Sequence, residues 1–122
     1  MIHGTGIDLV EVRRIEKLIK NHAALGRIFG EDELKYLSRK QTAESYAANF
    51  CAKEAFAKAL GTGVRGFKLC EVELLRDDLG KPFYKLSGDA LKLAQGLIFH
   101  ISITHTATYA AAFTVAERID HG

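Results

Sequence analysis

A carboxylate and a lysine on one predicted helix are the residues of this chain best placed to do chemistry. Residues 46–60 are alanine-rich and almost wholly apolar, which predicts a helix, and Gly61 is a natural end for it. A helix without a polar face is expected to be buried, yet this one carries Glu54 and Lys58 in its last turns. Burying an unpaired carboxylate costs on the order of several kcal/mol, so Glu54 needs a cation nearby. Lys58, four residues on, supplies one, and together they could form part of a metal or phosphate site.

The simplest alternative is a surface ion pair, because opposite charges four residues apart on a helix commonly pair. Asp8 favours the metal hypothesis. It stands near the end of a predicted strand, residues 2–9, where it would either cap the following helix or ligate a metal. Asp8 and Glu54 would offer two hard oxygen ligands, and Mg²⁺ usually takes one or two carboxylates together with water and substrate phosphate.

Two further segments carry groups that could bind phosphate. The glycine-rich stretch from Gly61 to Gly63 is at least a helix cap and loop, and its backbone could also cradle a phosphate. His105 and Thr106 end a predicted strand and form either a hydrogen-bonded turn or a pair of phosphate donors. The other histidines are not spaced with one another or with cysteines in the way that zinc ligands are, which argues against a zinc site.

The predicted helix at residues 11–20 has its charges sorted onto one side. Its apolar residues share a face, and four basic residues lie opposite: Arg13, Arg14, Lys17 and Lys20. Such a face is most simply solvated. It could also dock an acidic helix of a partner protein.

Composition restricts the classes of protein that fit. We expect residues 1–122 to form a single domain, because this length supports one core. The net charge of +2 does not indicate nucleic acid, and no apolar run approaches the roughly 20 residues that span a bilayer. The N-terminus lacks the pattern of a signal peptide, and Cys51 and Cys70 form no disulfide framework. We therefore expect a cytoplasmic protein with no nucleic-acid or membrane partner.

Strands and helices are mixed without regular alternation, which predicts an α+β fold with a largely antiparallel sheet. Thr42 is a plausible N-cap for the long helix, and Pro82 begins a strand after a turn at 77–80. The other predicted strands are 2–9, 67–75, 98–104 and 108–115, and the other predicted helices are 11–20, 31–36 and 88–95.

Five motifs stand in the order and spacing of a known family. They are Gly6-Ile-Asp8, Phe50-Cys-Ala-Lys-Glu-Ala-Phe-Ala-Lys58, Gly61-Thr-Gly63, Gly80-Lys-Pro82 and Ser102-Ile-Thr-His-Thr106. Together they resemble the holo-acyl-carrier-protein synthases, which are small 4′-phosphopantetheinyl transferases. The resemblance covers nearly the whole chain. It implies the transferase fold, with a long central helix packed on the sheet, and a place in fatty acid biosynthesis.

The resemblance also implies a reaction. Members of the family transfer 4′-phosphopantetheine from coenzyme A to a serine of apo acyl carrier protein and release adenosine 3′,5′-bisphosphate. Asp8, Glu54 and Lys58 would be catalytic, with Asp8 and Glu54 holding Mg²⁺. The residues expected to contact coenzyme A are Lys53, Gly61, Gly63, Lys81, Pro82, His105 and Thr106. The acyl carrier protein would dock on Arg13, Arg14 and Lys17, and the protein would be a homotrimer with sites between subunits.

Two points stay open at the level of sequence. The acceptor of the serine proton is unassigned, and a water held by Asp8, Glu54 or the metal is the first choice. Asn49 stands where the family often has Arg, directly before the aromatic residue of the Lys-Glu motif. If that Arg holds the 3′-phosphate of coenzyme A, then Arg65, Lys68 or a neighbouring subunit would have to compensate.

Two other functions compete with the transferase. A non-catalytic module could bind coenzyme A or a nucleotide and dock an acidic partner, but it would have no need to retain Asp8, Glu54 and Lys58 together. A structural trimer could use the Glu54–Lys58 pair only to specify packing. The sorted basic helix and the motif at 102–106 would then be coincidences.

Overall fold

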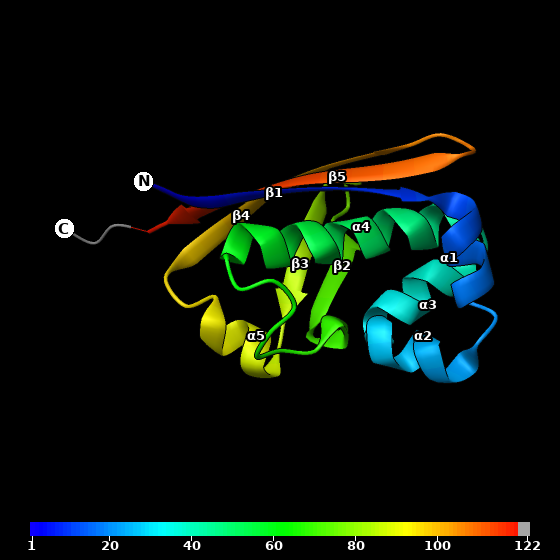
Figure 1. Cartoon of the computed structure of the whole chain (residues 1–122), viewed down its shortest axis with the longest axis horizontal. Coiled ribbons are helices and arrows are strands. Elements are labelled where there is room, and N and C mark those ends of the chain that lie inside the picture. Colours follow the sequence, from blue (N-terminus) through cyan, green and yellow to red (C-terminus); the bar gives the residue numbers. More distant parts are fainter. Residues whose placement is uncertain (120–122) are drawn as a thin grey trace.

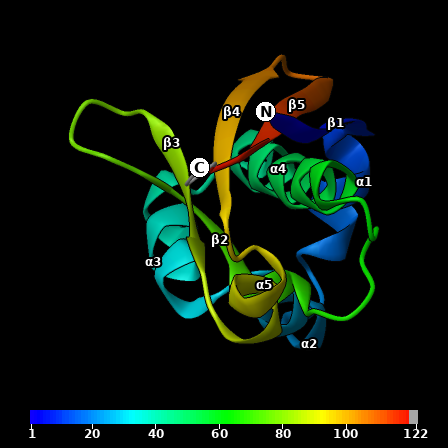
Figure 2. The same ribbon diagram turned by 90° about the vertical axis from the view of Figure 1, so that its left-hand side faces the viewer.

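The structure, a computed structural model, describes residues 1–119. A three-stranded antiparallel sheet has the order β1-β5-β4, and a separate antiparallel pair is formed by β2 and β3 (Figures 1 and 2). The prediction of an α+β fold is confirmed. The elements in chain order are β1 (Ile2–Glu11), α1 (Val12–Leu18), α2 (His22–Ile28), α3 (Glu31–Lys40), α4 (Ala43–Leu60), the short 3₁₀ helix η1 (Leu69–Glu71), β2 (Val72–Arg76), β3 (Pro82–Leu86), α5 (Gly88–Leu93), β4 (Leu97–His105) and β5 (Tyr109–Arg118).

Helix α4 is the centre of the molecule and begins and ends where its sequence predicts. The Thr42 side chain accepts a hydrogen bond from the backbone N–H of Ser45 at 3.3 Å, which caps the N-terminus. Gly61 ends the helix with a φ of 95°, a left-handed conformation that glycine adopts without strain. Most residues between these two points are buried. None of the helices in the described part of the chain is both long and apolar enough to cross a bilayer.

The backbone of β1 lies directly against the backbone of α4 at two glycines. A Cβ atom on Gly4 would stand 2.2 Å from the carbonyl oxygen of Ala59, and one on Gly6 would stand 2.0 Å from that of Ala55. No side chain fits in either place. This contact explains why two residues that weaken a strand occur inside β1.

The two faces of the three-stranded sheet have different surroundings. Gly6 and Val10 face α4 and are buried, whereas Ile7 and Leu9 point the other way and are each 65% exposed. Phe113 pairs with Ile7 across the sheet and is 45% exposed on the same outer face. Within residues 1–119 no helix covers this outer face (Figure 1).

The second sheet is joined to the first through an aromatic cluster. Phe56 of α4 contacts the rings of Tyr84 and Phe99 with centroid distances of 5.2 and 4.6 Å. The Tyr84 hydroxyl donates to the carbonyl oxygen of Ala52 at 2.5 Å and is 2.8 Å from the Thr114 hydroxyl. Strands β3 and β5 are thereby attached to the same helix.

Two predictions about local structure differ from what is found. Helix α2 was not expected, although Asn21 is a recognisable cap that accepts hydrogen bonds from the N–H groups of Ala23 and Ala24. The strand predicted at 67–75 begins later, because η1 precedes β2. Lys68 supports η1, since its backbone N–H donates to Glu71 at 3.0 Å.

We expect Gly6→Ala to separate β1 from α4. The new methyl group would clash with backbone that cannot move independently, so the free energy of unfolding should fall by about 3 kcal/mol or more. Urea denaturation followed by circular dichroism measures the change. Gly26→Ala is the matched control, because nothing lies within 4 Å of a Cβ there and its helix should gain stability. Equal effects of the two substitutions would contradict the close contact.

Candidate active site

Three charged side chains from two elements meet beside the contact between β1 and α4. Asp8 lies two residues beyond Gly6, so its side chain faces α4. The Lys58 ammonium donates to the carbonyl oxygen of Ile7 at 2.8 Å and lies 3.5 Å from Asp8 Oδ1. Glu54 is one helical turn before Lys58 and is partly buried.

The structure removes one of the alternatives that the sequence left open for Asp8 and one for Lys58. Asp8 does not cap α1, whose N-cap residue is Glu11 and has no side-chain capping bond. Lys58 forms its ion pair with Asp8 of β1. Among the described residues it forms none with Glu54, so the expected pair within the helix is wrong. The lysine therefore ties two elements together and is not a surface i,i+4 partner.

The surroundings of Glu54 disfavour its charge. Burial and the charge of Asp8 raise the pKa of Glu54, while Lys58 and Arg14 act to lower it. Below them Cys51 is fully buried, and its thiol donates to the carbonyl oxygen of Ala110 at 3.3 Å. Burial and the neighbouring Asp8 raise the pKa of Cys51 to about 12, so it stays a neutral thiol.

This donor set fits a hard divalent cation that keeps open coordination positions. Asp8 and Glu54 supply two carboxylates whose repulsion such an ion would relieve. In residues 1–119 no cluster of three or more His, Cys, Asp or Glu side chains has the geometry of a metal site. Water and substrate phosphate would have to complete the coordination, as is usual for Mg²⁺.

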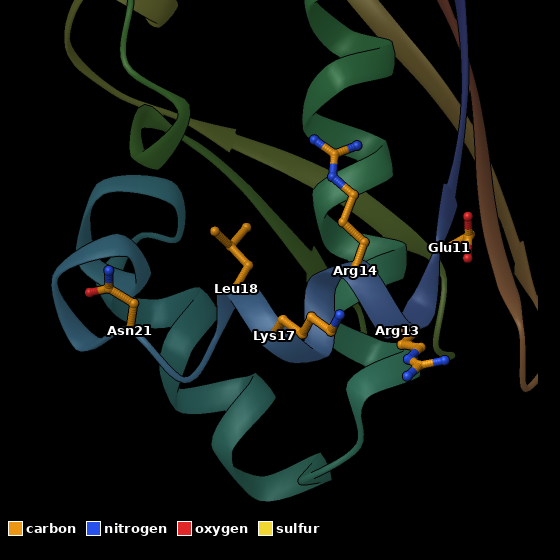
Figure 3. A pocket seen from close by; sticks show the side chains of 6 residues that line it. All are labelled: Glu11, Arg13, Arg14, Lys17, Leu18 and Asn21. Carbon is orange, nitrogen blue, oxygen red and sulfur yellow. The ribbon is translucent and has the colours of Figure 1, made fainter.

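The basic face of α1 is exposed next to this cluster, while Val12 and Ile15 are buried on the other side. A shallow hollow of about 520 Å³ lies over it (Figure 3). Arg14 extends from α1 toward α4, and its charge is felt by Glu54. The sequence did not predict this link between the basic face and the carboxylates. The residues that line the hollow are Glu11, Arg13, Arg14, Lys17, Leu18 and Asn21.

The other predicted ligand contacts lie apart from the carboxylates. Gly61 and Gly63 begin the loop after α4, roughly 10 Å along the helix axis from Glu54. Lys81 ends the turn of the β2–β3 hairpin and Pro82 begins β3, and this end of the hairpin projects away from α4 (Figure 2).

His105 and Thr106 lie where β4 turns into β5. His105 pairs with Ala110 of β5, and Ala110 pairs in turn with Val10 of β1. The Thr106 hydroxyl accepts from the N–H of Thr108 and so holds the turn. Since β1 and β4 are the two edges of the sheet, a whole strand separates these residues from Asp8.

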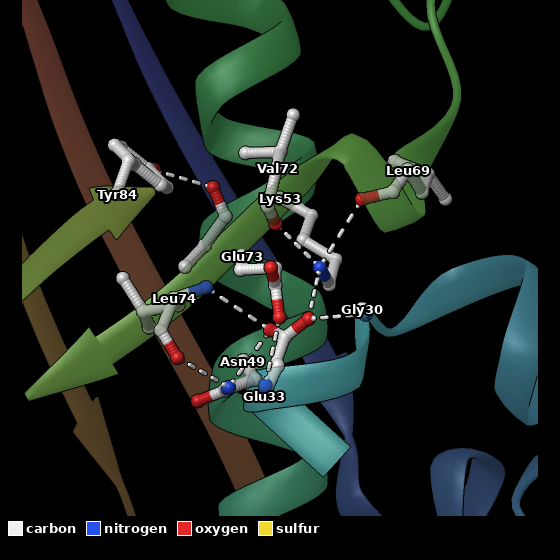
Figure 4. A network of polar contacts seen from close by, with 10 residues as sticks. Gly30, Glu33, Asn49, Lys53, Leu69, Val72, Glu73, Leu74 and Tyr84 are labelled. Atoms are coloured by element: carbon white, nitrogen blue, oxygen red, sulfur yellow. Dashed lines mark hydrogen bonds and ion pairs between the residues drawn. The ribbon is translucent and has the colours of Figure 1, made fainter. Parts of the chain in front are cut away.

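Two residues expected near the ligand lie in the core (Figure 4). The Lys53 side chain is 0% exposed and forms an ion pair with Glu33 at 2.5 Å. Asn49 is also 0% exposed, and its amide nitrogen donates to Glu33 at 2.9 Å and to the carbonyl oxygen of Leu74 at 3.0 Å. The prediction that Lys53 contacts coenzyme A and the hypothesis that Asn49 faces its 3′-phosphate are therefore wrong. Sequence reasoning missed Glu33, whose acidic position in the first turn of α3 suggested no more than a cap.

Comparisons with known proteins show the family. The profile of the 4′-phosphopantetheinyl transferase superfamily matches residues 4–114. A holo-[acyl-carrier-protein] synthase from Clostridium botulinum is 45% identical over 123 residues, which cover 98% of this chain and 100% of that protein.

Solved structures show the same similarity. The holo-[acyl-carrier-protein] synthase of Neisseria meningitidis superposes with a TM-score of 0.87 at 37% identity and covers 97% of this chain and 100% of that one. The Bacillus anthracis synthase, solved in complex with CoA (3′,5′-ADP), gives 0.83 at 35% identity over 97% of this chain and 98% of that one.

We expect Asn49→Leu to reduce stability and to leave ligand binding unchanged. It removes a buried hydrogen bond to a charged carboxylate, which contributes about 1.5–3 kcal/mol. Urea denaturation would show the loss, and calorimetric titration with coenzyme A would show a dissociation constant within twofold of the parent. Gln95→Leu, at an exposed amide, is the control for both measurements. Weakened binding at full stability would contradict the buried role of Asn49.

Proposed function

This chain belongs to the 4′-phosphopantetheinyl transferase superfamily, and we propose that it is a holo-[acyl-carrier-protein] synthase. Its substrates are coenzyme A and apo acyl carrier protein. The observation that carries the proposal is the meeting of Asp8, Glu54 and Lys58 beside an exposed basic helix. A non-catalytic binding module gives no reason for two carboxylates to be held close at an electrostatic cost.

The reaction is a displacement at phosphorus. The serine oxygen of the carrier forms a bond to the β-phosphorus of coenzyme A, and the bond to the bridging oxygen breaks. The leaving group is adenosine 3′,5′-bisphosphate, and the serine proton goes to a base. Such a transfer depends mainly on positioning and on neutralising charge. Lys58 is suited to this role, because it is half exposed and already held in place by Ile7 and Asp8.

Asp8 and Glu54 would hold the Mg²⁺ ion. When bound, the ion would neutralise charge on the pyrophosphate. The two side chains would also orient a water that accepts the serine proton, because they are the carboxylates of the cluster. Arg14 would add positive charge at the same place, since it already acts on Glu54.

We place the complete site between subunits of a homotrimer. His105 and Thr106 would contact the phosphates of coenzyme A from a second copy, because β5 separates them from Asp8 within one chain. The apolar outer face of the sheet, with Ile7, Leu9 and Phe113 exposed, supports an assembly of this kind. The loop from Gly61 to Gly63 would lie along the same ligand, and the Gly80–Pro82 turn would line its adenine side.

The carrier would dock on Arg13, Arg14 and Lys17, which surround the hollow over α1. An acidic helix is the complementary surface. We place the protein in the cytoplasm, where the free thiols of Cys51 and Cys70 would stay reduced, and its holo carrier product would serve fatty acid biosynthesis.

Mass spectrometry of an apo carrier incubated with this protein, coenzyme A and Mg²⁺ tests the function. The carrier should gain the mass of one phosphopantetheine. Asp8→Asn and Glu54→Gln should each reduce the rate at least a hundredfold, because each removes one of two charged ligands. Neither should lower the melting temperature greatly, since each relieves repulsion between the carboxylates. Asp89→Asn, at an exposed position of α5, is the control. Rates within a few-fold of the parent would remove the metal assignment.

Charge reversal on α1 tests the docking face. We choose Arg13→Glu with Lys17→Glu, because Arg14 also acts on Glu54 and would confuse the result. The KM for the carrier should rise tenfold or more at low salt. The difference from the parent should shrink as salt is added, because the screening length is about 8 Å at physiological ionic strength.

Coenzyme A affinity should stay unchanged in that double variant. The control is Lys35→Glu with Lys92→Glu, which changes the net charge equally on other helices. A carrier KM that responds equally to both pairs would show that only net charge matters.

A further inference from the structure

The ammonium of Lys53 is completely satisfied by three partners in the core. It lies 2.5 Å from Glu33 Oε1, and it donates to the carbonyl oxygens of Val72 at 2.5 Å and of Leu69 at 3.2 Å (Figure 4). A lysine has three N–H donors, so none remains for a ligand. Leu69 belongs to η1 and Val72 to β2, and both follow the loop after α4.

Glu33 is equally well satisfied. Its Oε1 accepts from the backbone N–H of Gly30 as well as from Lys53, and its Oε2 accepts from Asn49 and from the N–H of Leu74. Burial raises the pKa of Glu33 and lowers the pKa of Lys53. The positive charge of Lys53 opposes the first shift, and the negative charge of Glu33 opposes the second. Four elements, α3, α4, η1 and β2, are thus tied at one point.

Stability alone is a weak explanation for this pair. Replacing a buried ion pair by apolar residues of similar size is often neutral or stabilising. An ion pair whose donors and acceptors are all hydrogen-bonded does, however, fix the positions of the segments that carry its hydrogen-bond partners. The segment fixed here is the end of the loop that follows α4.

That loop is attached to α4 at both of its ends. Gly61 begins it as the C-cap of the helix, and Lys53 holds the carbonyl oxygen of Leu69, just beyond its last residue. Between these points the loop has no regular secondary structure in the described chain, and Gly63 and Gly66 adopt positive φ. Its far end is held by the Lys53 bond to Leu69, by the packing of Phe67 on Phe56 and by the N–H of Lys68, which donates to Glu71.

We propose that Lys53 is a positioning residue for coenzyme A: it holds the loop at 61–68 in the conformation that binds the substrate phosphates. This inference rests on the proposed function, in which the loop contacts coenzyme A. Lys53 itself touches no ligand and acts through Leu69 and the loop. In this proposal Lys53 increases the affinity for coenzyme A although it is buried in the core, and its neighbour Glu54 is a ligand of the metal.

The decisive comparison is between Glu33→Gln and the double variant Glu33→Gln with Lys53→Met. Both lack the charged pair, but only the first keeps an amine whose N–H groups can donate to the carbonyl oxygens of Leu69 and Val72, whether or not it stays charged. Both should melt at lower temperature than the parent, so they are measured where circular dichroism shows each to be folded. Calorimetric titration with coenzyme A should give a dissociation constant within twofold of the parent for Glu33→Gln and at least tenfold weaker for the double variant.

Steady-state kinetics distinguishes a positioning role of Lys53 from a simple loss of folded protein. The double variant should show a raised KM for coenzyme A, a kcat within a few-fold of the parent and an unchanged KM for the carrier. A purely structural role would lower kcat through a smaller active fraction and leave both KM values and the dissociation constant alone. That result would overturn the inference.

Limited trypsin digestion measures the flexibility of the loop directly. Arg65 and Lys68 are exposed cleavage sites within it, and cleavage there should be several-fold faster in the double variant. Unchanged cleavage would also overturn the inference. Lys53→Met alone is the second variant if the double one does not fold, because Glu33 can then take up a proton.

The surface pair Asp32–Lys85 provides a matched control. Asp32→Asn with Lys85→Met removes an ion pair between α3 and β3 and should change neither coenzyme A affinity nor cleavage. A parent that binds no coenzyme A would contradict the proposed function itself. If the parent binds coenzyme A and the double variant binds it equally tightly, only the role of Lys53 is contradicted.

Discussion

The contact between the backbones of β1 and α4 is the constraint on which the rest of the structure depends. With no side chain at Gly6, the strand lies close enough for the carbonyl oxygen of Ile7 to accept a hydrogen bond from Lys58. Asp8 follows and reaches the same lysine. A larger residue would lift the strand away and separate these charges, whose interaction weakens as the distance between them grows. The site is therefore built on two rigid elements, which suits chemistry that depends on position.

Helix α4 carries two lysines whose environments are opposite. Lys53 and Lys58 are five residues apart, which places them on different sides of the helix. Lys58 is half exposed beside Asp8, and Lys53 is sealed in the core against Glu33. The same helix thus supplies one cation, Lys58, to the solvent-facing site and a second cation, Lys53, to the interior. Both depend on carboxylates from other elements, which explains why the helix tolerates charge although it is buried on most sides.

Local signals were enough to predict much of the fold. Thr42 and Gly61 mark the ends of α4, and the glycines of β1 mark a close approach before any coordinates are known. Asp8 and Glu54 could be paired because two hard oxygen ligands suggest one metal. The burial of Lys53 and Asn49 could not be predicted, because it depends on Glu33, which lies 16 and 20 residues earlier in the chain and marks only a helix start. A motif shows that its residues matter, but it does not show which of them face the ligand.

The arrangement of the sheet is the basis of our proposal that the complete site lies between subunits. Asp8 is on the edge strand β1, His105 is on the opposite edge strand β4, and α4 packs on the face between them. Strand pairing continues as far as His105, and hydrogen bonds between Thr106 and Tyr109 close the turn, so no loop movement can carry His105 across. A second copy can present its own β4 edge beside β1. In the proposed homotrimer, association would cover the apolar outer face of the sheet, and the need to bring His105 near Asp8 would set the relative orientation of the copies.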